Sequence, residues 1–139
     1  MANDQKTKSL ERVRQNCMES FGKMLDHHEL LGRYLPESLE KWFESRKLLF
    51  RDPPQGAFTP RERELIAVAI EITARKPNVA GHTKRAMEAG ATVHEIAEVA
   101  FTCILLAGMI TYVESGQSAL RAAEEYEKGR GEVIRTRKS

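Results

Sequence analysis

The sequence predicts an all-α protein of about six helices. Apolar residues recur at three- and four-residue steps along most of the 139-residue chain, which is the spacing of one helical face. No stretch shows the strict apolar–polar alternation of a half-buried strand, and no internal repeat is found. Length and composition fit a single domain over residues 1–139, with the polar residues 1–8 and the basic tail 130–139 expected to be flexible.

Composition argues against several classes of function. Apolar residues make up 41% and charged residues 30%, the ordinary balance of a globular protein in water. The net charge is only +2 and the basic residues are scattered among acids, so nucleic-acid binding has weak support. No run approaches the ~18–20 apolar residues of a membrane span, and the first residues lack the apolar core of an export signal. We therefore expect a cytoplasmic protein that binds neither nucleic acid nor membrane.

The cysteines and paired histidines form no metal or redox motif. Cys17 and Cys103 are far apart and match no zinc or thiol-pair spacing, so both are expected to be reduced. His27 and His28 are adjacent, and adjacent side chains on a helix point about 100° apart, which disfavours joint metal binding. No metal site is predicted.

The first two helices are predicted before residue 51. One runs from about Ser9 to His27, with Gly22 inside it as a place for close helix contact and its histidines near solvent. The other begins at Pro36, because proline suits the first helical position. Trp42 is predicted to be a core or interface anchor of this second helix. Two prolines and a glycine end it.

The third helix is predicted to be central and to carry two acids. Thr59 and Glu62 form a capping box that starts it, and the residues that follow are apolar on nearly every side. Glu64 and Glu71 are seven residues apart, almost two turns, so they share one stripe of the helix. Two interpretations remain open. The acids line a cavity or a close neighbour, or Glu64 is a surface acid and Glu71 pairs with Arg75.

The fourth helix follows a break at residues 75–78 and carries His82 on its apolar face. A lone histidine in that position is usually a satisfied core residue. Here the turn folds its helix back towards the one that bears Glu64 and Glu71, so an acid/base pair is the alternative. A fifth helix starts at Thr92, and a bend at Gly108 precedes a sixth, which Gly129 ends.

Three segments resemble a known family. They are residues 61–70 (RERELIAVAI), 81–91 (GHTKRAMEAGA) and 95–99 (EIAEV), and their order and spacing resemble the carboxymuconolactone decarboxylase family of the alkylhydroperoxidase D-like superfamily. The resemblance covers roughly residues 35–125. It implies an all-helical domain with a central antiparallel helix hairpin, assembled as a trimer or hexamer and working without a metal or organic cofactor.

The redox members of that superfamily carry a glutamate, a Cys-x-x-Cys pair and a histidine four residues after the second cysteine. Counting back from His82 places Arg75 and Asn78 at the cysteine positions, so the redox pair is missing. Glu64 best matches the family's glutamate, although its distance from His82 in the sequence is one residue shorter than in the redox pattern. The chain therefore resembles the branch without the thiol pair.

The resemblance implies a cofactor-independent carboxy-lyase that acts on a small unsaturated lactone acid or a related acidic metabolite. His82 is the candidate proton donor, with Glu64 or Glu71 tuning it. Arg75 and Arg85 are the candidates for binding an anionic substrate. Two alternatives remain. One is a non-catalytic small-molecule-binding or scaffold homologue, and the other is a peroxidase-like thiol oxidoreductase working through Cys103, which is more simply explained as an inert buried thiol.

Overall fold

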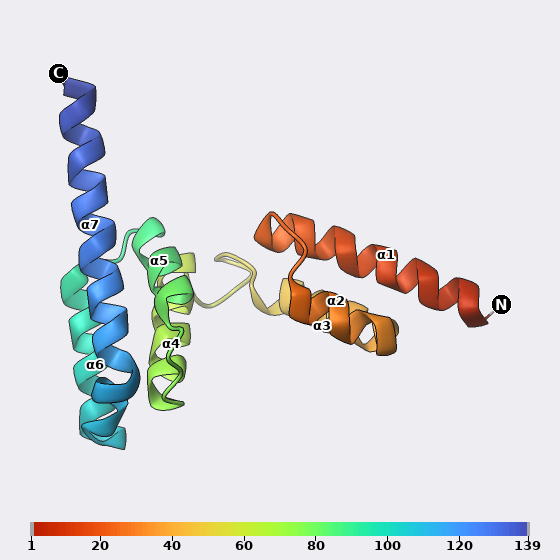
Figure 1. Ribbon diagram of the computed structural model, residues 1–139, viewed down its shortest axis with the longest axis horizontal. Coiled ribbons are helices and arrows are strands. Elements are labelled where there is room, and N and C mark those ends of the chain that lie inside the picture. Colours follow the sequence, from red (N-terminus) through yellow and green to blue (C-terminus); the bar gives the residue numbers. More distant parts are fainter. Residues whose placement is uncertain (1, 139) are drawn as a thin grey trace. The chain divides into compact units, whose positions relative to one another are not determined.

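The computed structural model describes residues 2–138, with side chains described for residues 3–133. Every regular element in that range is helical, which confirms the all-α fold class (Figure 1). The elements are α1 (Ala2–Phe21), α2 (Asp26–Tyr34), α3 (Pro36–Leu49), α4 (Pro60–Thr73), α5 (Ala80–Glu88), α6 (Val93–Ala107), the π-helix η1 (Tyr112–Gly116) and α7 (Gln117–Lys138). They divide into two compact units, Met1–Arg51 and Asp52–Ser139.

The N-terminal unit packs α1 and α2 against α3. Its core is small and joins the apolar stripes of α1 and α3 through Val13, Cys17, Leu39 and Phe43. Gly32 of α2 allows a close approach, since a Cβ atom there would lie 2.8 Å from a methyl group of Leu10. The three helices therefore enclose one apolar core without the help of a strand.

Four expectations for this unit were wrong. The first helix ends at Phe21 rather than His27, because Gly22 adopts a φ of 71°, a left-handed conformation that glycine tolerates and that terminates helices. No atom lies within 4 Å of a Cβ built on Gly22, so it makes no close helix contact. The segment expected to be a connection is helix α2, and its His28 is buried rather than solvent-facing.

The C-terminal unit packs α4, α5, α6 and α7 around a larger core. The buried residues come from all four helices and from the turns on either side of α5: Val68, Ile72, Val79, Ala86, Met87, Ala91, Ile96, Ala100, Cys103, Ala119 and Ala123. The predicted capping box of α4 is present, since the Thr59 hydroxyl accepts from the Glu62 N–H and the Glu62 carboxylate accepts from the Thr59 N–H. Thr92 and Glu95 start α6 in the same way.

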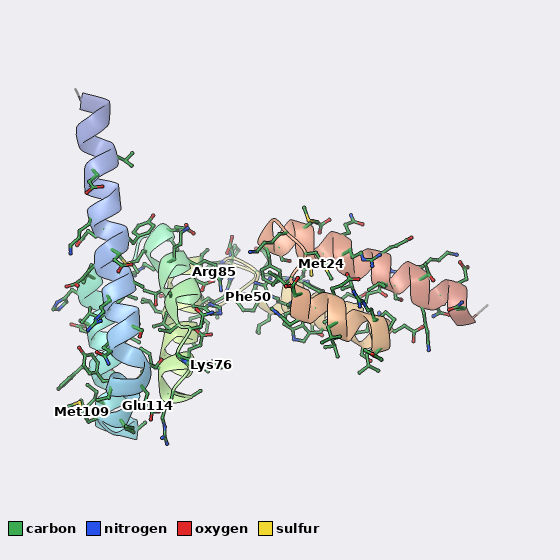
Figure 2. The ribbon with its side chains drawn as sticks, in the orientation of Figure 1. Met24, Phe50, Lys76, Arg85, Met109 and Glu114 are labelled. Atoms are coloured by element: carbon green, nitrogen blue, oxygen red, sulfur yellow. The ribbon has the colours of Figure 1, made fainter. Side chains whose placement is uncertain are left out.

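The turn after α4 is held by a distant segment. Arg75 has a φ of 56°, unusual for a residue with a side chain, and it reverses the chain towards α5. The Ser115 hydroxyl of η1 donates a 2.6 Å hydrogen bond to the Lys76 carbonyl oxygen. Lys76 and Glu114, the neighbour of Ser115, are labelled in Figure 2. This contact anchors the segment from which α5 begins.

The end of the chain differs from expectation in two ways. Gly108 ends α6 with a φ of 93°, as the predicted bend required, but a π-helix rather than a plain break follows it. Gly129 does not end the last helix, which continues to Lys138. The stretches 1–8 and 130–139 thus include helical residues, and their flexibility stays a prediction; residues 1 and 139 lie outside the described part.

Helix α4 is less buried than its composition suggested. Ile66 and Ile70 are exposed, and two residues of α6 are exposed further still, Leu105 at 69% and Leu106 at 84%. An apolar helix surface is equally suited to a core and to an interface, and here much of it is uncovered within one chain. Over residues 2–138, no helix combines the length and apolar character that crossing a membrane requires.

Candidate functional site

Helices α4 and α5 place the candidate residues side by side. Glu64 and Glu71 lie two turns apart on α4, with side chains 17% and 15% exposed. His82 lies in the first turn of α5, which is anchored by the buried Val79 and Thr83. The His82 side chain is 34% exposed, so it lies at the edge of the core rather than inside it.

His82 is hydrogen-bonded to Glu64. Its Nδ1 lies 2.7 Å from Glu64 Oε2. Burial opposes ionisation of Glu64, but the hydrogen bond from His82 and the charge of Arg85 outweigh it, so the pKa of Glu64 lies below its ordinary value. Glu64 is therefore an ionised acceptor at neutral pH, and Nδ1 must carry the hydrogen.

Arg85 completes this group from the next turn of α5 (labelled in Figure 2). Its Nε lies 3.4 Å from Glu64 Oε1, and one of its terminal nitrogens lies 2.9 Å from His82 Nδ1. One ring nitrogen cannot donate to Glu64 and accept from Arg85 at once. The shorter contact is to an ionised carboxylate, which gives the stronger, charge-assisted bond. We therefore assign the Arg85 attraction to Glu64, so that Nε2 is left without a hydrogen bond among the described residues.

Glu71 lies on the other side of the imidazole. Its Oε1 is 4.0 Å from His82 Nε2, which is too long for a direct hydrogen bond. Its Oε2 is buried and has no hydrogen-bond partner among the described residues. The two glutamates therefore play different parts, since Glu64 fixes the ring and Glu71 faces the nitrogen that remains free.

Arg75 does not join this cluster. Its guanidinium pairs with Glu114 of η1 at 3.8 Å, and within the described part of the chain no hydrogen bond or ion pair links it to His82 or to either glutamate. The alternative pairing of Glu71 with Arg75 is not formed. Of the two arginines expected to bind substrate, the structure brings only Arg85 to the histidine.

Cys103 makes its own contacts with α4. The Cys103 Sγ is buried, accepts from the Thr73 hydroxyl at 3.6 Å and donates to the Ala69 carbonyl oxygen at 3.5 Å. Arg75 and Asn78 occupy the positions at which the redox pattern has cysteines. Across the described residues, no group of three or more His, Cys, Asp or Glu side chains is arranged to hold a metal ion.

Sequence reasoning missed Ser115. It is fully buried, and it holds the turn between the two helices that carry the cluster. A serine 39 positions away from its acceptor leaves no local signal in one sequence. The proximity of His82 and Arg85, by contrast, follows from their three-residue spacing on a helix.

The comparisons with known proteins point in one direction. Residues 36–125 match the model of the carboxymuconolactone decarboxylase family. The chain is also similar to the crystal structure of a putative carboxymuconolactone decarboxylase from Burkholderia xenovorans LB400. That likeness has a TM-score of 0.75 and 25% sequence identity, and covers 91% of this chain and 96% of the other. No curated protein matches the chain.

Proposed function

Because the chain belongs to the carboxymuconolactone decarboxylase family, we propose that it is a lyase that removes carbon dioxide from a small unsaturated lactone acid. It acts in the cytoplasm and needs no metal or organic cofactor. The observation that carries the proposal is the 2.7 Å hydrogen bond between His82 and Glu64, which leaves the other ring nitrogen available for a proton transfer. The similar Burkholderia protein is itself described as a putative carboxymuconolactone decarboxylase.

The reaction needs a proton donor. When the bond between the substrate carbon and its carboxylate breaks, carbon dioxide leaves and the electron pair stays on the carbon, spread over the unsaturated lactone. Nε2 of His82, which is bare in the neutral ring, first takes up a proton from solvent, and that proton then moves to the carbon. Glu64 stabilises the imidazolium through Nδ1. The partly exposed ring then regains its proton from solvent.

The substrate carboxylate needs a cation. Arg85 is the first candidate, because its guanidinium lies beside both His82 and Glu64. Arg75 can contribute only after it exchanges Glu114 for the substrate. Arg85 is therefore the main residue for binding the substrate carboxylate, and Arg75 is an additional one.

The test is a turnover screen of unsaturated lactone acids that measures carbon dioxide release. His82→Ala should lose at least ~100-fold in kcat/KM, the usual contribution of a positioned acid or base. His94→Ala is the matched control, since His94 is exposed on α6 and contacts Glu98. Equal turnover by wild type and His82→Ala would refute the proposed role of His82.

A second candidate is a small-molecule-binding homologue without catalysis. It is favoured by an apolar groove on α4 lined by Ile66, Ala69, Ile70, Thr73 and Ala74. Saturable binding of the same lactone acids without release of carbon dioxide would support it. The thiol oxidoreductase alternative gains nothing from Cys103, whose sulfur is engaged on both sides.

We also propose that the chain forms a homo-oligomer, a trimer or a hexamer. The support is the exposed apolar surface of α4 and α6, which includes Ile70, Phe101, Leu105 and Leu106. Uncovered apolar area of this kind is favourable to bury against another copy.

A further inference from the structure

A second cavity lies in the N-terminal unit, apart from the residues of the proposed reaction. It has a volume of about 330 Å³ and lies between α2 and α3. Its wall consists of three leucines with His27, His28, Ser38 and Trp42, and it includes no Asp, Glu, Lys or Arg. That size is in the range of sites for small organic molecules, and the wall suits an uncharged one, because it offers an ion no counter-charge.

His28 is the unusual member of this wall. It is 91% buried, with a relative exposure of 9%, and its ring lies 5.6 Å from Phe21, 5.5 Å from Trp42 and 5.4 Å from Phe43 between centroids. Its Nδ1 is buried with no hydrogen-bond partner among the described residues. A buried polar nitrogen without a partner lowers the stability of the site that holds it. One more hydrogen bond to the His28 ring would therefore be stabilising.

The charge state of His28 selects the kind of bond. Burial, the neighbouring His27 and the charge of Arg46 lower the pKa of His28, so the imidazole is neutral at neutral pH. A neutral imidazole has one nitrogen that accepts a hydrogen bond. Because Nδ1 is buried as the ring stands, binding requires the ring to turn about the Cβ–Cγ bond so that a nitrogen faces the cavity.

We propose that this cavity is a binding site for a small neutral phenol. The aromatic ring of the ligand packs against Trp42 and the leucines, and its O–H donates to the imidazole of His28. An aliphatic ligand would leave the aromatic wall without a stacking partner. An aromatic carboxylate would bring a charge that no lining residue balances.

The test uses Trp42, which is the only tryptophan of the chain and lines the cavity. The indole fluorescence of the full chain is followed during titration with 4-methylphenol, 4-methylanisole and 4-methylbenzoate. The three probes share one ring and methyl group, but the anisole cannot donate a hydrogen bond and the benzoate is charged. We expect a saturable change with the phenol and at least about tenfold weaker binding of the other two, a difference of about 1.4 kcal/mol.

Variants assign the preference to His28. His28→Phe keeps an aromatic ring and removes the acceptor, so it should bind the phenol and the anisole equally. His28→Gln keeps an acceptor in case the first variant fails to fold, and it should retain part of the preference. His94→Ala, in the other unit, should bind like wild type. Equal affinities for phenol and anisole in wild type would overturn the proposal, as would a non-saturable response. A response that vanishes as the protein is concentrated would also overturn it, because a second copy would then cover the cavity.

Discussion

His82 forms one strong hydrogen bond, and that bond predicts which of its ring nitrogens carries the hydrogen. Nδ1 donates its hydrogen to an ionised Glu64. In the neutral ring, Nε2 should therefore carry no hydrogen. In Glu64→Gln the carboxylate is lost, and the tautomer should become mixed. We also expect kcat/KM on the proposed substrate to fall by about tenfold or more.

The measurement is the nitrogen chemical shifts of the imidazole in ¹⁵N-histidine-labelled protein. Glu71→Gln is the control, because Glu71 lies 4.0 Å from Nε2, on the side of the ring away from Nδ1. If Glu71→Gln mixes the tautomers and Glu64→Gln does not, the roles assigned to the two glutamates are reversed.

The burial of His28 predicts how the stability of the protein changes with pH. Its folded-state pKa lies below the ordinary value of 6.5, because of burial first and then of His27 and Arg46. The unfolded chain therefore binds the proton at a higher pH than the folded one, and acidification below about pH 6.5 favours unfolding. Urea unfolding followed by Trp42 fluorescence should show lower stability at about pH 5.5 than at about pH 7.5. His28→Gln should show a smaller difference, and an undiminished one would exclude His28 as its source.

At the scale of elements, the pair formed by α4 and α5 depends on η1. Ser115 satisfies the Lys76 carbonyl oxygen at the turn, and it is fully buried there. Ser115→Ala should cost about 1–3 kcal/mol in the free energy of unfolding, since the carbonyl is left without its partner. It should also lower turnover, because the turn determines where α5 places His82.

Thr102→Ala is a matched control for that experiment. Its hydroxyl donates to the Glu98 carbonyl oxygen within α6 and is exposed, so its loss should change stability by no more than about 0.5 kcal/mol. Urea unfolding of both variants gives the comparison. Similar losses in the two would mean that η1 does not hold the turn.

At the scale of the whole molecule, the exposed face of α4 and α6 predicts self-association. Leu106 is 84% exposed, and Leu106→Lys would place a charge in the middle of an apolar contact. The variant should have a smaller mass than wild type by size-exclusion chromatography with light scattering. Val133→Lys, at an exposed position of α7, is the control and should leave the mass unchanged. A monomeric wild type would contradict the proposed oligomer.

Local features of the fold could be predicted because they depend on a few neighbouring residues. The two capping boxes, Thr59 with Glu62 and Thr92 with Glu95, form as expected. The end of α1 could not be predicted in the same way. The residues after Gly22 continue the apolar spacing of the first helix, and only the structure shows that Gly22 adopts a φ of 71° and ends the helix there.

Burial was harder to predict than helicity. The side chains of α4 are apolar on most sides, which suits both a central helix and one that meets another chain. Ile70 is exposed within one chain and Ile72 is fully buried, two positions apart. No property of the two isoleucines distinguishes them, because burial depends on which helices lie on each side.

The sequence by itself determined the family, the helical fold class and the identity of the candidate residues, since each follows from residue type and spacing. The tertiary structure alone decided that Glu64 rather than Glu71 bonds to Nδ1 of His82, and that Arg75 turns to Glu114. The physical reason is that these distances depend on how α5 is set beside α4. That placement rests on a turn held by Ser115 from a distant part of the chain.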